Sequence, residues 1–342
     1  MPSSAPVRSG QRHQYFRVGG PPTRMTDGLP DEIKQLLDER SRHRDARDFE
    51  AADAVRDQLR ALGWEVMDSA RGSSARPVLP DAPVATGFAR PEDLESRLGE
   101  PATLDASVQL VTDDHPDDLH RMLRGLAAHR PAHAYELVVV ANAPAFDLDS
   151  LLEDVWPQPA AVLRTTERLG WADARNLGLR RSLGRVTIML DTSLEPTGNV
   201  IDPLVSAFDD PSLGVAGGWG VMSADGRQFE EAPPGDVDAI EGYCLAVRRE
   251  VLRDVGLFDH RFRFYRNADL DFSFAVRDAG WRARRLDGLP FERHEHRGYA
   301  SLPEGERDRL SKRNFYRFLK RWGDRRDLLL RPGPPHTHDH AH

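Results

Sequence analysis

The stretch GRVTIMLDTSLEP (184–196) joins an apolar run at 186–190 to a polar turn at 191–193. An apolar run of this length, bounded by a glycine and a polar cluster, is typical of a buried strand rather than a helix. In open α/β sheets, ligands bind just beyond the carboxyl ends of the strands. The stretch therefore predicts a strand whose end places Asp191 where a carboxylate holds a metal ion or a sugar hydroxyl.

The segments on either side of this stretch alternate between short apolar runs and helical periods. We expect strands at 107–111, 136–140, 161–163 and 213–218, and helices at 117–127, 148–155 and 171–183. Further along we expect a strand that turns into a short helix at 244–252, a helix between Asp269 and Gly280, and a basic amphipathic helix at 304–322. Strands that alternate with helices predict an α/β domain, with a mainly parallel sheet and helices on both faces.

The chain is predicted to divide into several parts. Its 342 residues exceed the length of one typical domain, so we expect a main domain with an appendage. In order we expect a disordered stretch at 1–29, a small helical hairpin at 30–75, a linker at 76–105 with a short helix at 92–98, the α/β domain at 106–325, and a His- and Pro-rich tail at 326–342.

Composition narrows the class of protein. The net charge of −8 argues against nucleic-acid binding by the molecule as a whole. The single cysteine, Cys244, excludes an intramolecular disulfide and a multi-cysteine zinc site, and it suits a reducing cytoplasm. No stretch approaches the roughly 20 apolar residues of a membrane span. We expect a cytoplasmic protein, and for the helix at 304–322 we favour packing on the domain over peripheral contact with the inner face of the membrane.

Several well-known catalytic motifs are missing. The sequence contains no Walker phosphate loop, no GxGxxG after a strand, no GxSxG elbow and no HExxH. Polar side chains instead follow the predicted strands, and they are Asp113, Asp114, Asp191, Asp269, Asp271, His294 and His296. Taken singly, carboxylates in loops are usually solvated, so their order along the chain matters more than any one of them.

That order resembles a family 2 glycosyltransferase with the GT-A fold, over residues 107–323. SVQLVTDDH (107–115) is similar to the family's SVVIPTYN. ADARNLGLRRSLGRVTIMLDTS (172–193) is similar to ArNxGlxxAxGxxxxfLDxD, with Arg175, Asn176, Gly178 and Gly184 in register. GLFDHRFRFYRNADLDFSFAVRDAGW (256–281) is similar to GxFDexFxxyxEDxDLxxRxrxaGy, and histidines follow in FERHEHRG.

The resemblance implies a reaction and a set of site residues. It implies transfer of a hexose from a nucleotide-diphosphate sugar to an acceptor hydroxyl on a glycan or other molecule, with inversion and with a divalent cation, Mn²⁺ or Mg²⁺. Asp269 takes the position of the base that removes the acceptor's proton. The implied donor-binding residues are Thr112, Asp114, Asn142, Arg175, Asn176, Asp191 and Ser193. The implied metal ligands are Asp191 with His294 or His296, and the acceptor-side residues are Trp219, Glu241 and Asp271.

Three departures from the family pattern lie at acidic positions. The DxD triplet is DTS, so the neutral Ser193 replaces its second carboxylate. Ala141 replaces the early nucleotide-binding acid, and Ala268 replaces the acid before the base. Asp113, Asp114 and Glu195 are candidate substitutes. These departures leave open an alternative, a weakened or inactive GT-A pseudoenzyme that acts as a glycan- or protein-binding module.

A second resemblance covers the predicted hairpin. Residues 39–73 are similar to the small helical domain at the carboxyl end of cysteinyl-tRNA synthetases. They include neither the nucleotide-binding signatures nor the zinc-binding cysteines of those enzymes. Aminoacylation is therefore not implied. Packing or protein contact is the favoured role, and RNA binding is disfavoured because acidic residues interleave with the arginines.

Overall fold

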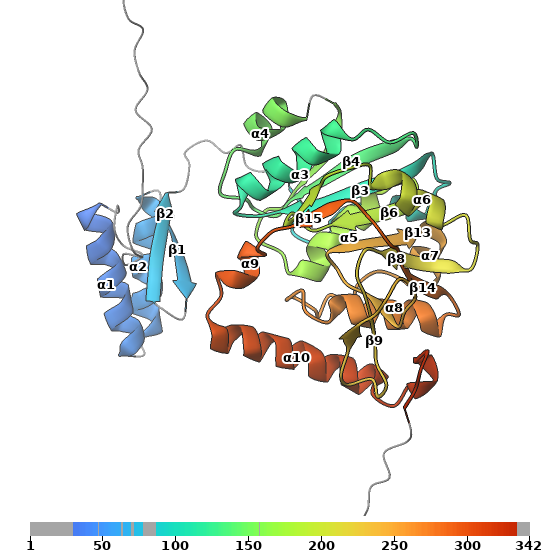
Figure 1. Ribbon diagram of the computed structural model, residues 1–342. Coiled ribbons are helices and arrows are strands. Elements are labelled where there is room, and N and C mark those ends of the chain that lie inside the picture. Colours follow the sequence, from blue (N-terminus) through green and yellow to red (C-terminus); the bar gives the residue numbers. More distant parts are fainter. Residues whose placement is uncertain are drawn as a thin grey trace, which may run out of the picture. The chain divides into compact units, whose positions relative to one another are not determined.

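The computed structural model describes residues 30–46, 48–62, 64–69, 72–77, 87–156 and 158–333. They belong to two compact units, which divide between Ala82 and Pro83 (Figure 1). The stretch 1–29, expected to be disordered, lies outside the described residues, as does the end of the tail at 334–342.

The first unit contains the expected helical hairpin and a β-hairpin that we did not predict. Its elements are α1 (Asp31–Asp45), α2 (Phe49–Ala61), β1 (Trp64–Ser69) and β2 (Gly72–Pro77). Asp48 caps α2 by accepting a hydrogen bond of 3.1 Å from the amide of Ala51. Ile33, Leu37, Val55 and Leu59 form the core, and the antiparallel β-hairpin packs Trp64, Val66 and Ala75 against it.

The second unit is built on an eight-stranded, mainly parallel sheet, which confirms the predicted fold class. Its strand order is β11-β14-β8-β13-β6-β3-β4-β5, and β13 runs antiparallel to both neighbours. The strands are β3 (Leu104–Thr112), β4 (Tyr135–Ala141), β5 (Ala160–Arg164), β6 (Gly184–Leu190), β8 (Leu213–Gly217), β11 (Gly235–Asp236), β13 (Cys244–Arg248) and β14 (Arg282–Arg285). The apolar run that opened the sequence is thus β6, near the middle of the sheet.

Helices cover both faces of this sheet (Figure 1). One face carries α3 (Pro116–Ala128), α4 (Leu148–Val155) and α6 (Ile201–Ala207), and the other carries α5 (Trp171–Arg181), α7 (Arg249–Asp254) and α8 (Ala268–Asp278). Because side chains alternate along a strand, Ile188 and Leu190 of β6 pack in the core under α3, whereas Met189 packs with α8.

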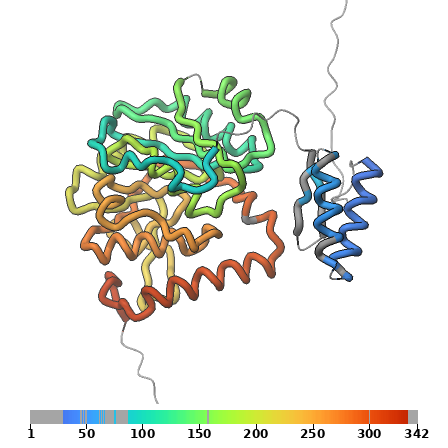
Figure 2. Tube along the Cα trace, turned by 180° about the vertical axis from the view of Figure 1, so that it is seen from behind, coloured from blue at the N-terminus to red at the C-terminus, as the bar shows by residue number. Residues whose placement is uncertain are grey.

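Smaller elements complete the unit. They are the ribbon of β7 (Leu194–Pro196) and β15 (Phe291–Arg293), the three-stranded sheet of β9 (Gly220–Met222), β10 (Glu230–Glu231) and β12 (Ala239–Ile240), and the helices α9 (Arg297–Ala300) and α10 (Glu304–Trp322). α10 runs beside α8 (Figure 2). Phe318 and Trp322 of α10 pack against Phe274 of α8. Within the described residues, no helix combines the length and apolar character needed to cross a membrane.

Both ends of the unit extend into segments that we expected to be linker or tail. Within the expected linker, two short 3₁₀ helices lie at Pro91–Asp93 and Arg97–Gly99, Phe88 pairs with Thr165, and Leu98 is buried. Leu328 and Leu329, in the expected tail, are buried beside Trp322. Residues 87–105 of the expected linker and the described part of the expected tail therefore belong to the α/β unit, whereas residues 76 and 77 end β2 of the first unit.

The structure gives a steric reason for two glycines of the sequence pattern. A Cβ on Gly184 would lie 2.4 Å from the carbonyl carbon of Ala106 and the amide nitrogen of Ser107, both on β3. A Cβ on Gly178 would lie 1.9 Å from the side-chain nitrogen of Gln109. Both glycines permit the close approach of β3 to the segment that ends at Asp191.

We expect Gly184→Ala to lower the free energy of unfolding by about 1–3 kcal/mol, because the methyl group would meet backbone atoms that cannot rotate away. Urea denaturation of the full chain measures this effect. Gly305→Ala is the matched control, since a Cβ at Gly305 meets nothing within 4 Å and alanine favours the helix. Equal stability of the two variants would contradict the steric reading.

The hydrogen bonds of Asp202, in α6, predict that part of the protein's free energy of unfolding is lost at low pH. Its carboxylate accepts hydrogen bonds from the amide of Ala132 (2.9 Å) and from Asn199 (2.6 Å), and it lies 2.7 Å from the ring of His133. Burial raises the pKa of Asp202, but these partners outweigh burial and lower it to about 2. The stabilisation is therefore present above the unfolded-state pKa, near 4, and is lost as the pH falls towards 2.

We expect Asp202→Asn to destabilise the protein at pH 7 by about 1 kcal/mol, a value that allows for solvent screening of a partly exposed group. The difference from the parent protein should shrink as the pH falls from 4 to 2. Urea denaturation at several pH values measures both effects, and a difference that is constant with pH would contradict the assignment.

Candidate active site

A cavity of about 300 Å³ opens beyond the carboxyl end of β6. Its polar wall is formed by Asp191 after β6, by 241–243 before β13, by 265–269 at the start of α8, and by His296. Its apolar wall includes Val221, Phe229, Leu270 and Phe315. The cavity thus lies where the sequence placed a ligand site.

Asp191 is fixed from several sides. Its amide donates to the carbonyl of Tyr243 (2.9 Å), and its carboxylate accepts hydrogen bonds from the amide (2.9 Å) and hydroxyl (2.5 Å) of Ser193. The other carboxylate oxygen lies 3.3 Å from Nε2 of His296. Two oxygen-bearing side chains and one imidazole thus converge, and this donor set fits a divalent cation such as Mn²⁺.

Charge reinforces the pairing of Asp191 with His296. Burial raises the pKa of Asp191, but the hydrogen bond and charge of His296 and the contacts of Ser193 outweigh burial and hold that pKa well below its usual range. Burial lowers the pKa of His296, but Asp191 outweighs it, so the pKa lies above its usual value. Asp191 therefore stays ionised at neutral pH.

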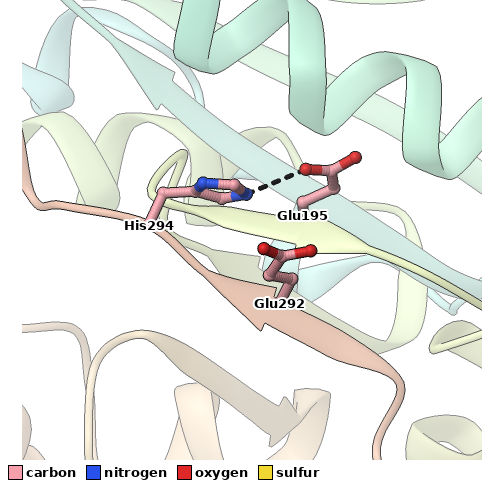
Figure 3. A group of neighbouring side chains, drawn as sticks. All are labelled: Glu195, Glu292 and His294. Atoms are coloured by element: carbon pink, nitrogen blue, oxygen red, sulfur yellow. Dashed lines mark hydrogen bonds and ion pairs between the residues drawn. The ribbon is translucent and has the colours of Figure 1, made fainter.

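Only one of the two predicted metal-ligand histidines reaches Asp191. Nε2 of His294 lies 2.8 Å from Oε2 of Glu195, in a group that also includes Glu292 (Figure 3). His296, two residues later, faces Asp191. The geometry favours His296 as the partner of Asp191 and places His294 in a different cluster.

Asp269 faces the same cavity from the start of α8. Its two carboxylate oxygens accept hydrogen bonds from the amides of Gly242 (2.8 Å) and Leu270 (2.9 Å). The chain turns into α8 through Asn267, whose φ of 66° is left-handed. Burial raises the pKa of Asp269, and burial together with the charge of Asp269 raises the pKa of Glu241, which also lines the cavity.

Arg175 and Asn176, two predicted donor-binding residues, instead hold the backbone beneath the site. Arg175 is buried and donates to the carbonyl of Leu190 (3.0 Å), and burial, opposed by Asp191, lowers its pKa to about 10. The side chain of Asn176 both accepts from and donates to the backbone of Phe258, at 3.0 and 2.8 Å. Neither residue lines the cavity.

Three further predicted donor-binding residues, Thr112, Asp114 and Asn142, lie near the ends of β3 and β4. Asn142 accepts a hydrogen bond from the amide of Leu169 (2.8 Å) and donates to its carbonyl, and its own amide donates to the carbonyl of Thr112 (2.9 Å). Asp114 pairs with Arg168 at 2.7 Å. None of these residues lines the cavity, so the structure brings only Asp191 of the predicted donor set into it.

The three predicted acceptor-side residues have different surroundings. Glu241 lines the cavity, whereas Trp219 packs outside it against Tyr243 and Phe291, with ring centroids 6.0 and 6.1 Å away. Asp271 is buried and accepts a hydrogen bond from the indole of Trp322 (2.8 Å). It joins α8 to α10.

Several residues that line the cavity were given no role from the sequence. They are Trp171, Arg227, Tyr265, Arg266, Asn267 and Phe315. The aromatic loop RFYRN (263–267) was visible in the sequence, but its role was not, because the ring of Tyr265 stacks on His296 (4.9 Å between centroids) from a distant segment. Phe315 comes from α10, which we expected to pack on the domain.

We expect Asp271→Ala to lower the free energy of unfolding by about 1–3 kcal/mol, because it leaves the buried indole N–H of Trp322 without its acceptor. Asp287→Ala should be nearly neutral, since this carboxylate is exposed. Urea denaturation of the two variants tests this contrast. Unchanged stability of Asp271→Ala would contradict the anchoring role.

Comparisons with known proteins fit this geometry. Residues 107–274 match the family model described as Glycosyl transferase family 2, and residues 26–74 match the Cysteinyl-tRNA ligase anticodon binding domain. A curated relative, the O-antigen biosynthesis protein RfbC of Myxococcus xanthus, is 21% identical over 247 residues, which cover 58% of this chain and 19% of RfbC.

Solved structures are similar as well. The crystal structure of GalNAc-T7 with UDP, GalNAc and Mn²⁺ has a TM-score of 0.52 and 18% identity, and the match covers 65% of this chain and 48% of that one. The mannosyltransferase PcManGT from Pyrobaculum calidifontis, in complex with GDP-Man and Mn²⁺, has a TM-score of 0.47 and 17% identity, covering 67% and 77% of the two chains.

This chain spans less than half the length of both RfbC and the GalNAc-T7 chain. The family match and the strand order nevertheless agree with the sequence pattern around Asp191 and Asp269. The α/β unit of this protein is a glycosyl transferase family 2 domain with the GT-A fold.

Proposed function

We propose that this protein transfers a sugar from a nucleotide-diphosphate sugar to a hydroxyl group of an acceptor, with inversion at the anomeric carbon and with the help of a divalent cation. The observation that carries the proposal is that Asp191 with His296, and Asp269, face one cavity. Asp191 and His296 offer ligands for a cation, and Asp269 offers a base.

On the donor side, Asp191, Ser193 and His296 would hold the cation. A bound Mn²⁺ or Mg²⁺ offsets the negative charge that develops on a departing diphosphate. The imidazole of His296 favours Mn²⁺ over Mg²⁺. The Mn²⁺ and UDP in the GalNAc-T7 structure support this choice for a protein of the same fold.

On the acceptor side, Asp269 would take the proton of the attacking hydroxyl. Two backbone amides fix its carboxylate, which then keeps one orientation towards the cavity. Burial raises its pKa, and a base works best when its pKa lies close to the operating pH. Direct displacement by the activated oxygen inverts the anomeric centre.

Aromatic side chains supply surfaces for the sugar rings. Trp171, Tyr243 and Tyr265 line the cavity. Aromatic faces pack well against the apolar side of a ring, while neighbouring carboxylates such as Glu241 accept hydrogen bonds from its hydroxyls. These residues support a hexose as the transferred group.

A non-catalytic alternative has one observation in its favour. Ser193 holds the position of the second carboxylate and is hydrogen-bonded to Asp191. A neutral hydroxyl binds a divalent cation more weakly than a carboxylate does. On this alternative the domain binds a glycan or a protein without turnover.

The first unit and α10 complete the proposal. We assign the helical unit to packing or protein contact rather than RNA binding, and the protein to the cytoplasm.

Arg317 and Arg321 of α10 hold this helix on the rest of the α/β unit, through the carbonyl of Arg261 and the carboxylate of Asp271. Lys312, Arg313 and Lys320 are exposed, so these side chains would make any contact of α10 with the anionic inner face of the membrane.

The test is turnover by the full-length protein, with Mn²⁺ and a panel of nucleotide-diphosphate sugars and acceptors. We expect Asp269→Asn to lower kcat by about 10²–10⁴-fold, because the variant cannot accept the proton, and to leave donor binding unchanged. The exposed Asp287 provides the control, Asp287→Asn, which should retain full activity.

Full turnover by Asp269→Asn would refute Asp269 as the base. Donor and Mn²⁺ binding by the parent protein without any turnover across the panel would favour the pseudoenzyme. Thermal-shift titration with each donor, with and without Mn²⁺, supplies the binding measurement because a ligand of the native state raises its apparent stability.

A further inference from the structure

The ribbon of β7 and β15 carries a cluster of side chains that the proposed reaction does not use. Glu195 of β7 lies directly opposite Glu292 of β15 in the antiparallel register. Because side chains alternate along a strand, His294 extends on the same face as Glu292. Arg293 extends on the other face, where its guanidinium lies 4.3 Å from the ring centroid of Tyr243.

The three side chains on this face point towards one another (Figure 3). One ligand atom from each of Glu195, Glu292 and His294 lies within 4.8 Å of the others. A tetrahedral ion bound at about 2.0–2.2 Å from each atom holds its ligand atoms about 3.3–3.6 Å apart. Glu292 would therefore move closer, and Glu195 and His294, which lie 2.8 Å apart, would separate slightly. Glu292 is exposed and free of packing constraints that would oppose this movement.

Charge on the ribbon also points to a cation. Two carboxylates directly opposite on neighbouring strands destabilise a sheet unless a positive charge lies between them. Glu195 lies 3.8 Å from the guanidinium of Arg121 and 2.8 Å from the imidazole of His294. Glu292 has no cationic partner among the residues that the structure describes, so the pair of carboxylates is only partly neutralised.

We propose that Glu195, Glu292 and His294 bind a divalent transition-metal ion of the zinc type, at a site separate from that of Asp191 and His296. One imidazole and two carboxylates, with water completing the shell, are a ligand set that Zn²⁺ accepts. The site does not depend on the proposed sugar transfer, because none of its ligands lines the cavity.

The ion would connect β15 to β7 beside the Asp191 turn. The amide of His294 already donates to the carbonyl of Ser193 (2.8 Å), so the two strands continue into the residues that face the cavity. His296 lies three residues after the last residue of β15, so its position opposite Asp191 depends on where β15 ends. A metal link across the ribbon therefore orders the segment that carries His296.

Zinc titration by calorimetry tests this site. All proteins are full-length and carry alanine in place of the tail residues His336, His338, His340 and His342, because alternating histidines bind zinc on their own. We expect Glu292→Gln and His294→Ala each to lose one equivalent of bound Zn²⁺, while Asp191→Asn keeps that equivalent.

The matched control is Glu295→Gln, an exposed carboxylate next to His294 that is not part of the cluster, and it should bind zinc as the background protein does. Zinc should also raise the Tm of Asp191→Asn but not of the double variant Asp191→Asn/Glu292→Gln, in which both proposed cation sites are removed. Zinc binding by Glu292→Gln and His294→Ala that equals the background would overturn the proposal, as would an equal loss in Glu295→Gln.

Discussion

The site depends on a buried positive charge beneath the end of β6. Arg175 is 2% exposed and donates to the carbonyl of Leu190, the last residue before Asp191. An arginine so deeply buried requires a compensating negative charge, and the charge of Asp191 supplies it. In return the guanidinium helps to keep Asp191 ionised in a site where burial disfavours a carboxylate. The helix α5 and the strand β6 are thus coupled at the cavity.

The fold was predictable because its pattern is local and repeated. Short apolar runs such as 186–190 alternate with amphipathic helical periods, and each pattern specifies its element without knowledge of the rest of the chain. The β-hairpin of the first unit was missed because its second strand, GSSARP (72–77), lacks the apolar alternation that marks a strand. Its pairing with β1 and the helices stabilises it, which is information that no single segment contains.

The site was less predictable than the fold. Asp191, Glu241 and Asp269 were predicted and line the cavity, because each lies at or next to the end of a helix or strand. His294 and His296 were equivalent in the sequence, since only Glu295 separates them and only the path after β15 decides which one faces Asp191. A motif also does not distinguish a ligand-binding side chain from one that holds the backbone, and Asn176 is of the second kind.

The anchoring of α10 has a consequence for how such a domain diversifies. The family match ends at Phe274, whereas Phe315, which closes one wall of the cavity, belongs to α10. α8 carries both Asp269, which faces the cavity, and Asp271, which ties α10 in place through Trp322. The wall is therefore built from a part of the chain outside the common domain and fixed to the same helix as the proposed base. Substitution along the inner face of α10 would reshape this wall of the cavity without changing Asp191, His296 or Asp269, which come from other elements.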